Sequence, residues 1–201
     1  MPEYVLNRLH QEFPWVKLQQ TYGLTEVGIL RSKSKDNHSL FVKVGGEDYQ
    51  TRIVDNMLEI KSKSAMLGYL NAPNPFTKDG WFKTGDVVES DGEYIRILGR
   101  KSEIINVGGE KVYPVEVENV IQSMNGVQDV AVVGVPHPIT GNIVRANVKL
   151  TTSEDLSHFK IRMHQYCKDK LQRFKIPQQV IMMNTELHSE RFKKMRRAYE
   201  Y

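Results

Sequence analysis

The stretch from Gly80 to Glu118 constrains the fold most, because glycine-containing turns cut it into short segments before Pro114 can begin a helix. The turns are KDGW, SDG and a double glycine at Gly108-Gly109. Between them, EYIRIL alternates apolar and polar residues, which is typical of a half-buried strand. The stretch also combines a turn-linked acid, a basic hairpin and the glycine pair. This density indicates a functional site as well as a core.

The N-terminal half is predicted to consist mainly of short strands. Residues 2–13 have the apolar spacing of a helix, which Pro14 ends. Residues 16–18 predict a short strand that leads into the segment YGLTE. Residues 39–61 contain three β-like pieces, LFVKV, YQTRIV and MLEIK, separated by GGED and DN turns.

The C-terminal half alternates strands with two helices. EIINV, a GG turn and KVYP predict a hairpin, and Pro114 then occupies the favoured first position of a helix. DVAVVGV and IVRANVKL are predicted strands on either side of the loop PHPITGN. Ser153 is the predicted N-cap of a second helix, and VIMM is the last strand. The residues of that helix expected to point inward are Leu156, Phe159, Met163, Cys167 and Leu171.

These elements predict an α+β fold. A small β-rich subdomain comes first, and a compact α+β domain follows it. We expect residues 1–99 to form the first domain and residues 100–201 the second, joined near residues 99–102.

Composition excludes several classes of protein. The 201 residues are 40% hydrophobic and 26% charged, and no apolar run approaches the roughly 20 residues of a membrane helix. The first residues lack a secretory leader pattern. Cys167 is the single cysteine, so no intramolecular disulfide can form. A cytoplasmic location is the expectation, with no membrane partner.

The net charge of +4 has two interpretations. Much of the basic excess lies near the C-terminus, at Arg191, Lys193, Lys194, Arg196 and Arg197. These side chains could form a solvated face, or they could meet phosphate groups or a nucleic acid.

Two short motifs in the N-terminal half carry candidate ligand-binding groups. In YGLTE, Thr25 could donate a hydrogen bond to a phosphate oxygen and Glu26 could bind a divalent cation. The alternative is a glycine turn followed by a capping Thr-x-Glu. In Thr84-Gly85-Asp86, the acid could accept hydrogen bonds from a ribose diol or could close an Asx turn.

Further candidates lie at and after the domain junction. Arg100 could grip an anion with two nitrogens, or could form an interdomain salt bridge. Gly108-Gly109 offers backbone N–H groups and room for a narrow thiol or phosphopantetheine channel, or is a plain hairpin turn. Lys193, next to Lys194, could stabilise charge on a phosphoryl or carboxylate oxygen.

Other chemistry has less support. His137 has no partner at metal-ligand spacing and is interpreted as structural. Cys167 lies on the inward face of its helix, where a buried inert thiol is expected. No Gx-Ser-xG elbow and no P-loop spacing occurs, which argues against an α/β-hydrolase or a P-loop nucleotidase.

The motifs together resemble those of the adenylate-forming superfamily, which includes acyl-CoA synthetases, peptide-synthetase adenylation domains and firefly luciferase. The order YGLTE, MLEIKSKSAMLGYLNAP, GWFKTGD, ILGRKSEIINVGGEKVYPVEVE and RFKKMRR follows the family's later motifs over nearly the whole chain. The resemblance implies that residues 1–99 are the C-terminal part of the large domain. Residues 100–201 would be the C-terminal lid.

The resemblance implies an ATP-dependent acid–thiol ligase, most like an acyl-CoA ligase of fatty acid metabolism. A carboxylate attacks the α-phosphate of ATP to give acyl-adenylate and pyrophosphate, and a thiol then displaces AMP. The implied ligands are a carboxylic acid, ATP or AMP, Mg²⁺ and CoA, with CoA favoured over a carrier protein. No nucleic acid is needed.

Roles carry over residue by residue. Thr25 would contact the phosphate, and Glu26 would bind Mg²⁺ with ATP. Lys193 would be the catalytic lysine that bridges acyl and phosphate oxygens, with Lys194 as a rival. The remaining assignments place Tyr22 and Gly23 beside the adenine and acyl group, Asp86 and Arg100 on the ribose hydroxyls, Gly108 and Gly109 on the thiolation face, and Ser102 at the hinge.

The chain also departs from the family pattern. Ser102 stands where the family has Asp or Lys, and Phe192 replaces a glycine before the catalytic lysine. The Ser/Thr/Gly-rich phosphate loop that precedes YGLTE in full-length members is absent from these residues. We therefore expect a C-terminal portion that is inactive in adenylation by itself. It would associate with the missing N-terminal part or with a second copy. The alternative is a non-catalytic binding or regulatory module that uses its basic C-terminus.

Overall fold

The computed structural model describes residues 2–188 and 194–196, and it divides into two compact units. The N-terminal unit comprises residues 1–102 and the C-terminal unit residues 103–201. The division lies three residues after the boundary expected from the sequence. Strands dominate both units and helices are few, so the predicted α+β fold class is confirmed.

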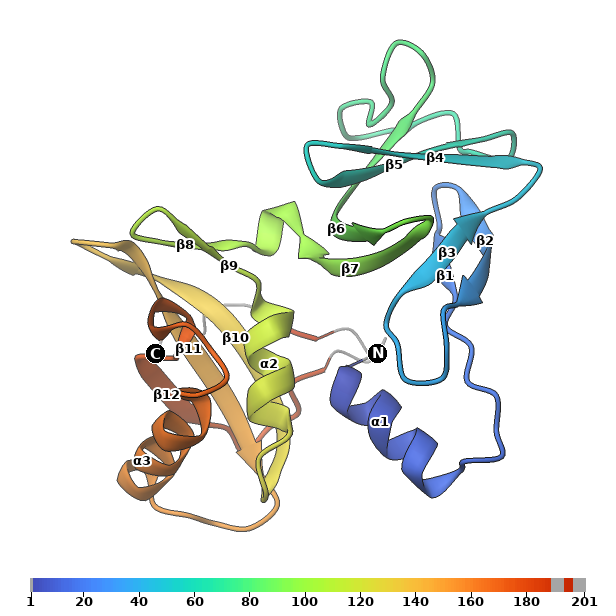
Figure 1. Ribbon diagram of the computed structural model, residues 1–201. Helices are drawn as coiled ribbons and strands as arrows, with labels where there is room; N and C mark the ends of the chain where they lie inside the picture. The colour runs from blue at the N-terminus through green and yellow to red at the C-terminus, as the bar shows by residue number, and fades with distance from the viewer. Residues whose placement is uncertain (1, 189–193, 197–201) are drawn as a thin grey trace. The chain divides into compact units, whose positions relative to one another are not determined.

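The N-terminal unit contains one helix and an antiparallel sheet (Figure 1). The seven strands of the sheet follow the order β1-β2-β3-β7-β6-β5-β4. Its elements are α1 (Glu3–Glu12), β1 (Tyr22–Leu24), β2 (Gly28–Ser34), β3 (Val42–Gly45), β4 (Tyr49–Val54), β5 (Met57–Ser62), β6 (Phe82–Asp91) and β7 (Tyr94–Arg100).

Local sequence explains most of this sheet. Asp55 and Asn56 have φ of 50° and 61°, the left-handed pair that a two-residue hairpin turn between β4 and β5 requires. The apolar residues of alternate positions meet in one core, whose buried members include Leu30, Ile60 and Phe82. The sheet therefore supports the loops at its strand ends.

Two predictions for the N-terminal unit need correction. No strand forms at residues 16–18; the chain is irregular there and β1 begins only at Tyr22. The sequence also did not predict β2 and β6. GILRSKS buries only Leu30, and FKTGDVVESD is interrupted by Gly85, so neither has a clear period of two. The predicted helix over residues 2–13 is confirmed as α1.

The described residues of the C-terminal unit form two helices and a five-stranded sheet. A 3₁₀ turn, η1 (Lys101–Glu103), spans the boundary with the N-terminal unit. The elements are β8 (Ile105–Val107), β9 (Glu110–Val112), α2 (Pro114–Gln122), β10 (Val127–His137), β11 (Gly141–Leu150), α3 (Leu156–Cys167), the 3₁₀ turn η2 (Arg173–Lys175) and β12 (Gln179–Met182).

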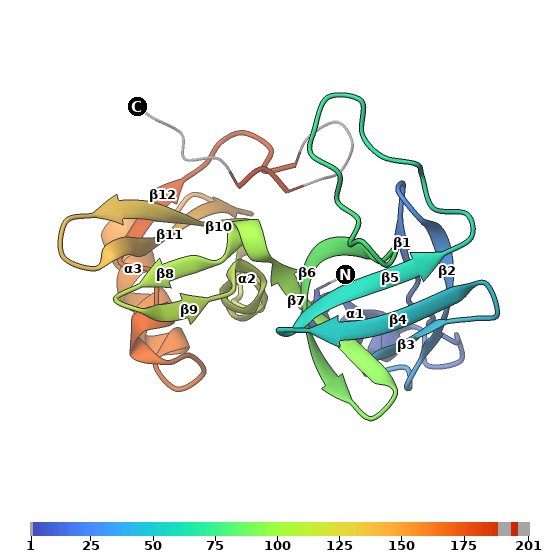
Figure 2. The ribbon, with the colours of Figure 1, turned by 90° about the horizontal axis from the view of Figure 1, so that it is seen from above.

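Both helices cover the same face of this sheet. Val117 and Ile121 of α2, and Phe159 and Met163 of α3, are buried in one cluster with alternate residues of β10 and β11. On the other face, Ala131 packs with residues that follow β12. Figure 2 shows the helices on one side of β10 and β11 and the described C-terminal residues on the other. β10 is an edge strand because β11 lies on only one side of it.

Most elements of the C-terminal unit agree with the sequence, including the β8–β9 hairpin and Pro114 at the first helical position of α2. Ser153 is not the N-cap of α3. Asp155 caps it, because its carboxylate accepts hydrogen bonds from the N–H groups of Ser157 (2.9 Å) and His158 (3.1 Å). Leu156 is partly exposed at the start of the helix.

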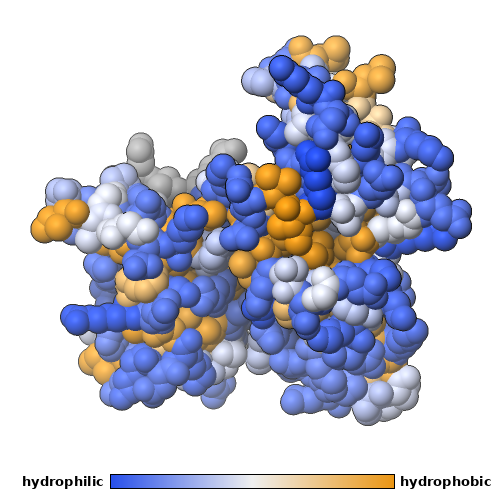
Figure 3. Space-filling model, turned by 45° about the horizontal axis from the view of Figure 1, so that its top comes forward, coloured by the Kyte–Doolittle hydropathy of each residue, from blue (hydrophilic) through white to orange (hydrophobic). Residues whose placement is uncertain are grey.

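The face drawn in Figure 3 is mainly hydrophilic, with hydrophobic patches between the polar groups. Leu67 and Leu70, in the loop between β5 and β6, are fully exposed. Among residues 2–188 and 194–196, no helix has the length and apolar character needed to cross a membrane.

Candidate functional site

The candidate site of the N-terminal unit is built around the Asp86 carboxylate. Asp86 on β6 lies directly opposite Arg100 on β7, so the two side chains are a cross-strand pair. Asp86 is only 5% exposed. Its Oδ2 accepts a hydrogen bond from the Tyr22 hydroxyl at 2.6 Å, and its Oδ1 lies 3.4 Å from Nε of Arg100. Three residues predicted from separate motifs therefore meet at one carboxylate.

Thr84 holds this carboxylate in place from within its own strand. The Thr84 hydroxyl accepts a hydrogen bond from the Asp86 N–H (3.0 Å) and donates one to the Leu58 carbonyl on β5 (2.7 Å). Between the two residues, Gly85 has a φ of 75°, which favours glycine. The TGD sequence thus makes a local bend that aims Asp86 at Tyr22 and Arg100 across the sheet.

In the hydrogen bond between them, Tyr22 is the neutral donor and the Asp86 carboxylate is the acceptor. Burial and the neighbouring Asp86 carboxylate raise the pKa of Tyr22 well above the usual value for a tyrosine. Tyr22 is therefore a neutral hydrogen-bond donor. Arg100 keeps more than half of its side chain exposed, so its guanidinium can contact both Asp86 and a ligand in solvent.

Glu26 forms a second carboxylate position beside this pair. Its Oε1 accepts a hydrogen bond from the Tyr69 hydroxyl (2.7 Å), and its Oε2 accepts one from the Thr25 hydroxyl (3.0 Å). The hydrogen bond from Tyr69 is the main reason why the pKa of Glu26 is lowered, and the charge of Arg100 adds to it. The carboxylate is ionised at neutral pH.

An ionised oxygen ligand is what Mg²⁺ requires. The described residues contain no group of three or more His, Cys, Asp or Glu side chains that could hold a metal ion by themselves. Glu26 therefore fits a single protein ligand to an ion whose other ligands come from phosphate oxygens and water.

Gly23 has a steric reason to be glycine. A Cβ atom there would lie 3.0 Å from Cα of Ile29 and 3.1 Å from the carbonyl of Gly28, on the paired strand β2. The close pairing of β1 and β2 excludes a side chain. This packing requirement exists apart from any contact with a nucleotide.

Ser102, the predicted hinge, lies in η1. The boundary between the two units falls directly after it. The assignment of Ser102 as a hinge stays a prediction.

The double glycine makes the β8–β9 turn. Gly108 and Gly109 have φ of 60° and 93°, so both need the conformational freedom of glycine. The Gly108 N–H donates to the Thr140 carbonyl (2.8 Å) and the Gly109 N–H donates to Oδ1 of Asn106 (2.9 Å). The expectation that these N–H groups are available to a ligand is therefore wrong in this structure, because the C-terminal unit itself uses both.

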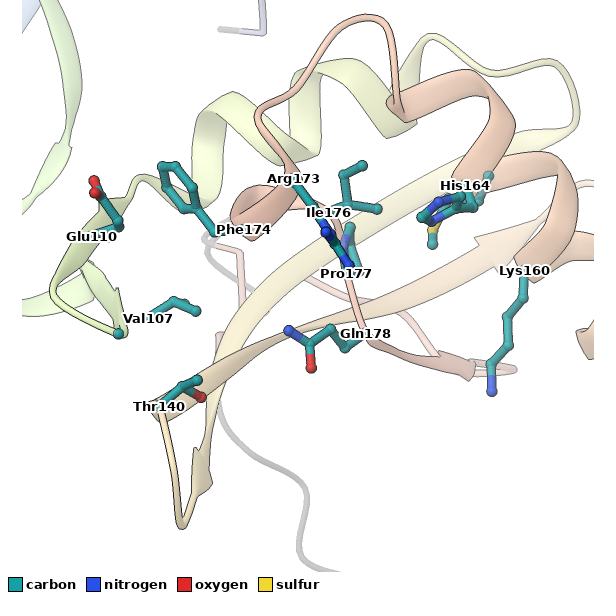
Figure 4. Close-up of a pocket in the computed structure, with 12 residues that line it drawn as sticks. Val107, Glu110, Thr140, Lys160, His164, Arg173, Phe174, Ile176, Pro177 and Gln178 are labelled. Carbon is teal, nitrogen blue, oxygen red and sulfur yellow. The ribbon is translucent and has the colours of Figure 1, made fainter.

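A pocket of about 890 Å³ opens next to this hairpin, within the C-terminal unit. Figure 4 shows Val107 from β8, Lys160 and His164 from α3, and Arg173 and Phe174 from η2 around it. Lys160, His164 and Arg173 are its basic groups, and Met163 and Ile176 are among its apolar ones. The sequence did not point to this pocket. The only signal was the spacing of Lys160 and His164, four residues apart on one helix.

The predicted catalytic Lys193 lies outside the described residues, as does Phe192. Its rival Lys194 is described. The Lys194 ammonium is mostly buried and lies 3.6 Å from Oε2 of Glu118 and 3.5 Å from Oδ1 of Asp129. A positive charge engaged by two carboxylates is poorly available for catalysis.

Comparison with known proteins shows what the chain is similar to. Residues 116–194 match the model of the AMP-binding enzyme C-terminal domain. A long-chain-fatty-acid–CoA ligase of Salmonella typhimurium is 34% identical over 190 residues, which is 83% of this chain and 33% of the ligase. A 2-succinylbenzoate–CoA ligase of Enterococcus faecalis is 33% identical over 182 residues, covering 80% of this chain and 36% of that enzyme.

Solved structures agree in fold. The ATP-bound RpMatB-BxBclM chimera B1 superposes with a TM-score of 0.83 at 29% identity, covering 94% of this chain and 42% of the chimera. ATP-bound MatB from Rhodopseudomonas palustris gives a TM-score of 0.74 at 29% identity, over 86% of this chain and 38% of MatB. The chain thus spans about a third of the length of the curated relatives it matches. The predicted likeness to the C-terminal portion of adenylate-forming enzymes is confirmed.

Proposed function

We propose that this chain, whose residues 116–194 belong to the AMP-binding enzyme C-terminal domain family, works as the C-terminal portion of an ATP-dependent acyl-CoA ligase. One observation carries the proposal. Tyr22, Asp86 and Arg100 come from three separate motifs and converge on one buried carboxylate, with Glu26 close enough for Arg100 to influence its charge.

The Asp86–Arg100 pair is suited to the ribose of ATP. Asp86 is an acceptor-only group with four lone-pair positions, and Tyr22 occupies one of them. The carboxylate can therefore accept hydrogen bonds from a vicinal diol. Arg100 has nitrogens beyond the Nε that approaches Asp86, and these can donate to a ribose oxygen or a phosphate oxygen.

Thr25 and Glu26 are assigned to the phosphate end. The Thr25 hydroxyl can turn from Glu26 to a phosphate oxygen, and the Glu26 carboxylate is ionised and can bind Mg²⁺. A bound Mg²⁺ neutralises phosphate charge during transfer. Tyr69 then keeps Glu26 oriented through the hydrogen bond to its Oε1.

The proposed reaction has two steps. A substrate carboxylate oxygen attacks the α-phosphorus of ATP; the new O–P bond forms as the bond to pyrophosphate breaks. The thiol of CoA then loses its proton and attacks the acyl carbonyl, and AMP leaves with the electrons of the broken C–O bond. Lys193 is the residue we assign to the first step, because Lys194 is engaged by Glu118 and Asp129.

The C-terminal unit supports CoA as the thiol. Its pocket combines the basic side chains Lys160, His164 and Arg173 with an apolar floor, which suits the phosphates and the nucleotide of CoA. The hairpin of Gly108 and Gly109 borders the same pocket. The relatives named above act on a long-chain fatty acid and on 2-succinylbenzoate, so a carboxylic acid of the fatty-acid class is the substrate we would test first.

ATP–pyrophosphate exchange tests the proposal. The measurement uses the 201-residue chain and a chimera in which it replaces the matching region of MatB from Rhodopseudomonas palustris. We expect exchange by the chimera and none by the 201 residues alone, which span about a third of such enzymes. Appreciable exchange by the 201 residues alone would contradict the expectation that they are inactive in adenylation without the rest of the enzyme.

Asp86→Asn should reduce exchange by the chimera at least tenfold and raise the KM for ATP, because an amide has only one acceptor oxygen, which cannot serve Tyr22 and both hydroxyls of the diol at once. Asp91→Asn is the matched control on the same strand, since Asp91 is exposed and pairs only with Lys35 among its described ion-pair partners. Equal exchange by the two variants would overturn the assignment of Asp86. An inactive chimera that binds generic DNA with a steep salt dependence would favour a binding module instead.

A further inference from the structure

We propose that Glu118 is a positioning residue: it anchors residues 194–196 along the edge of β10, and so limits where the neighbouring Lys193 can reach. The anchoring itself is independent of the proposed function. Only the catalytic consequence, which concerns Lys193, rests on it.

The anchor point is an unpaired position at the sheet edge. Within the described part of the chain, β10 has β11 on one side only, so the backbone N–H groups on its outer side need other partners. The Val132 N–H donates to Oε1 of Glu118 at 2.9 Å. Glu118 reaches this N–H from α2 and is 4% exposed. The helix thus presents a buried negative charge at the edge of the sheet.

Arg196 neutralises that charge with a two-point contact. Its Nε donates to Oε1 of Glu118 at 3.0 Å, and its Nη2 donates to Oε2 at 2.9 Å. Its Nη1 pairs with Glu103. Burial disfavours the charged guanidinium, but the two carboxylates outweigh this and raise the pKa of Arg196. Such planar bidentate pairs fix geometry as well as charge.

Further contacts bind the same segment to the C-terminal unit. The Lys194 ammonium lies between Glu118 and Asp129, and Asp129 also contacts Nδ1 of His188 at 2.9 Å. The Met195 N–H donates to the Leu187 carbonyl at 2.8 Å. The segment therefore runs back beside residues 187–188, with basic side chains directed to carboxylates on α2 and β10.

The anchored Arg196 lies close in sequence to Lys193. Glu118 belongs to the YPVEVE motif and Arg196 to RFKKMRR, and 78 residues separate the two in sequence. Three residues of extended chain cover at most about 11 Å. Lys193 stands three residues before Arg196 in the sequence, so a fixed Arg196 limits how far that lysine can reach.

Hydrogen exchange on the 201-residue chain tests the anchor without any activity. We compare Glu118→Gln, Arg196→Gln and the double variant. Each single substitution removes the ion pair, so we expect the Met195 amide to exchange at least tenfold faster, and the double variant to exchange no faster than either single one. Unchanged exchange, or additive effects of the two substitutions, would overturn the proposal.

Two controls separate anchoring from general unfolding. Glu116→Gln removes the same charge from the same helix, where Glu116 pairs with Lys175, and should leave Met195 exchange unchanged. Labelling of Cys167, buried in the core of the C-terminal unit, reports opening of that core. If Glu118→Gln speeds this labelling, Arg196→Gln decides the question, because Glu118 then keeps Val132 and Lys194 as partners.

The catalytic consequence is measured in the MatB chimera. Glu118→Gln should slow ATP–pyrophosphate exchange at least fivefold but leave thioester formation from supplied acyl-adenylate within twofold, as Lys193→Ala should. Equal loss in both half-reactions would mean a structural role and would refute the positioning of Lys193. An inactive wild-type chimera would count against the proposed function only, and the hydrogen-exchange result would still decide the anchor.

Discussion

Each unit of this molecule contains a buried carboxylate that pairs with arginine, and the two are satisfied differently. In the N-terminal unit, Asp86 has one neutral donor, Tyr22, and a half-exposed Arg100 at 3.4 Å. In the C-terminal unit, Glu118 has a mostly buried Arg196 at 2.9–3.0 Å, a backbone N–H and a nearby ammonium. The first acid keeps acceptor positions open, whereas the second is nearly saturated.

The different sets of partners at Asp86 and Glu118 indicate different roles for the two buried carboxylates. A buried charge without full compensation is costly, and a protein retains one where a ligand completes the set of partners. A carboxylate whose hydrogen bonds all go to protein groups instead holds those groups in a fixed position. Asp86 is thus the better ligand-binding candidate and Glu118 the better anchor. Substitution should affect stability more at Glu118 than at the Asp86 pair.

The largest effect is expected for Glu118→Ala. This substitution leaves Arg196 and the Val132 N–H without their main partner, and we expect the C-terminal unit to lose about 3 kcal/mol of unfolding free energy. Labelling of Cys167 should then accelerate about a hundredfold, since opening controls access to this buried thiol. Glu116→Ala is the control. A labelling rate within threefold of wild type would contradict the saturated character of Glu118.

A smaller effect is expected for Tyr22→Phe, which removes the hydrogen bond to Asp86. Loss of a bond to a charged acceptor should cost about 2 kcal/mol of unfolding free energy in the N-terminal unit. Urea unfolding followed by tryptophan fluorescence measures this unit, because Trp15 and Trp81 both lie in it. Tyr94→Phe on β7 is the control.

The same bond makes stability depend on pH. Folding raises the pKa of Tyr22, so its contribution is complete below the ordinary tyrosine pKa of about 10 and declines as the pH rises above it. The difference in unfolding free energy between wild type and Tyr22→Phe should therefore shrink between about pH 10 and pH 12. A constant difference in unfolding free energy over this range would contradict a stabilising hydrogen bond from the Tyr22 hydroxyl to Asp86.

The smallest effect is expected for Tyr69→Phe, because Glu26 is partly exposed to solvent. Folding lowers the pKa of Glu26, so the contribution of the Tyr69 hydrogen bond is present above the ordinary glutamate pKa and is lost as the pH falls through the folded value. Tyr69→Phe should lower the melting temperature slightly at pH 7 and not at pH 3. An NMR titration should find the pKa of Glu26 higher in the variant. An unchanged pKa would contradict the role of Tyr69 as the hydrogen-bond donor to Glu26.

The sequence predicted those residues of the candidate site that belong to short motifs with a recognisable charged side chain. Asp86, Arg100 and Glu26 stood beside turns, where an acid or a guanidinium is conspicuous. Tyr69, which holds Glu26, lies in an irregular loop where nothing marks its hydroxyl. Glu118 and Arg196 were each visible as members of motifs, but no local pattern indicates a contact between residues 78 positions apart.

The fold was predictable to a similar degree and for similar reasons. Hairpins and helices whose signals are local, such as the Asp55-Asn56 turn and Pro114, were found correctly. β2 and β6 were not, because their polar residues pair with neighbouring strands that only the assembled sheet supplies. Ser153 is predicted as the helix cap but Asp155 is the cap in the structure, since both residue types favour that position and only the backbone geometry selects between them.

The sequence by itself determined the family likeness, the α+β class and the residue types present at the site. These depend on turn residues, periodicity and motif order, which are properties of neighbours along the chain. Tertiary structure alone decided which acid is saturated. Partner identity and the edge position of β10 are set by segments distant in sequence, and they give Asp86 a tyrosine hydroxyl and a half-exposed guanidinium, and Glu118 a backbone N–H, a guanidinium and an ammonium.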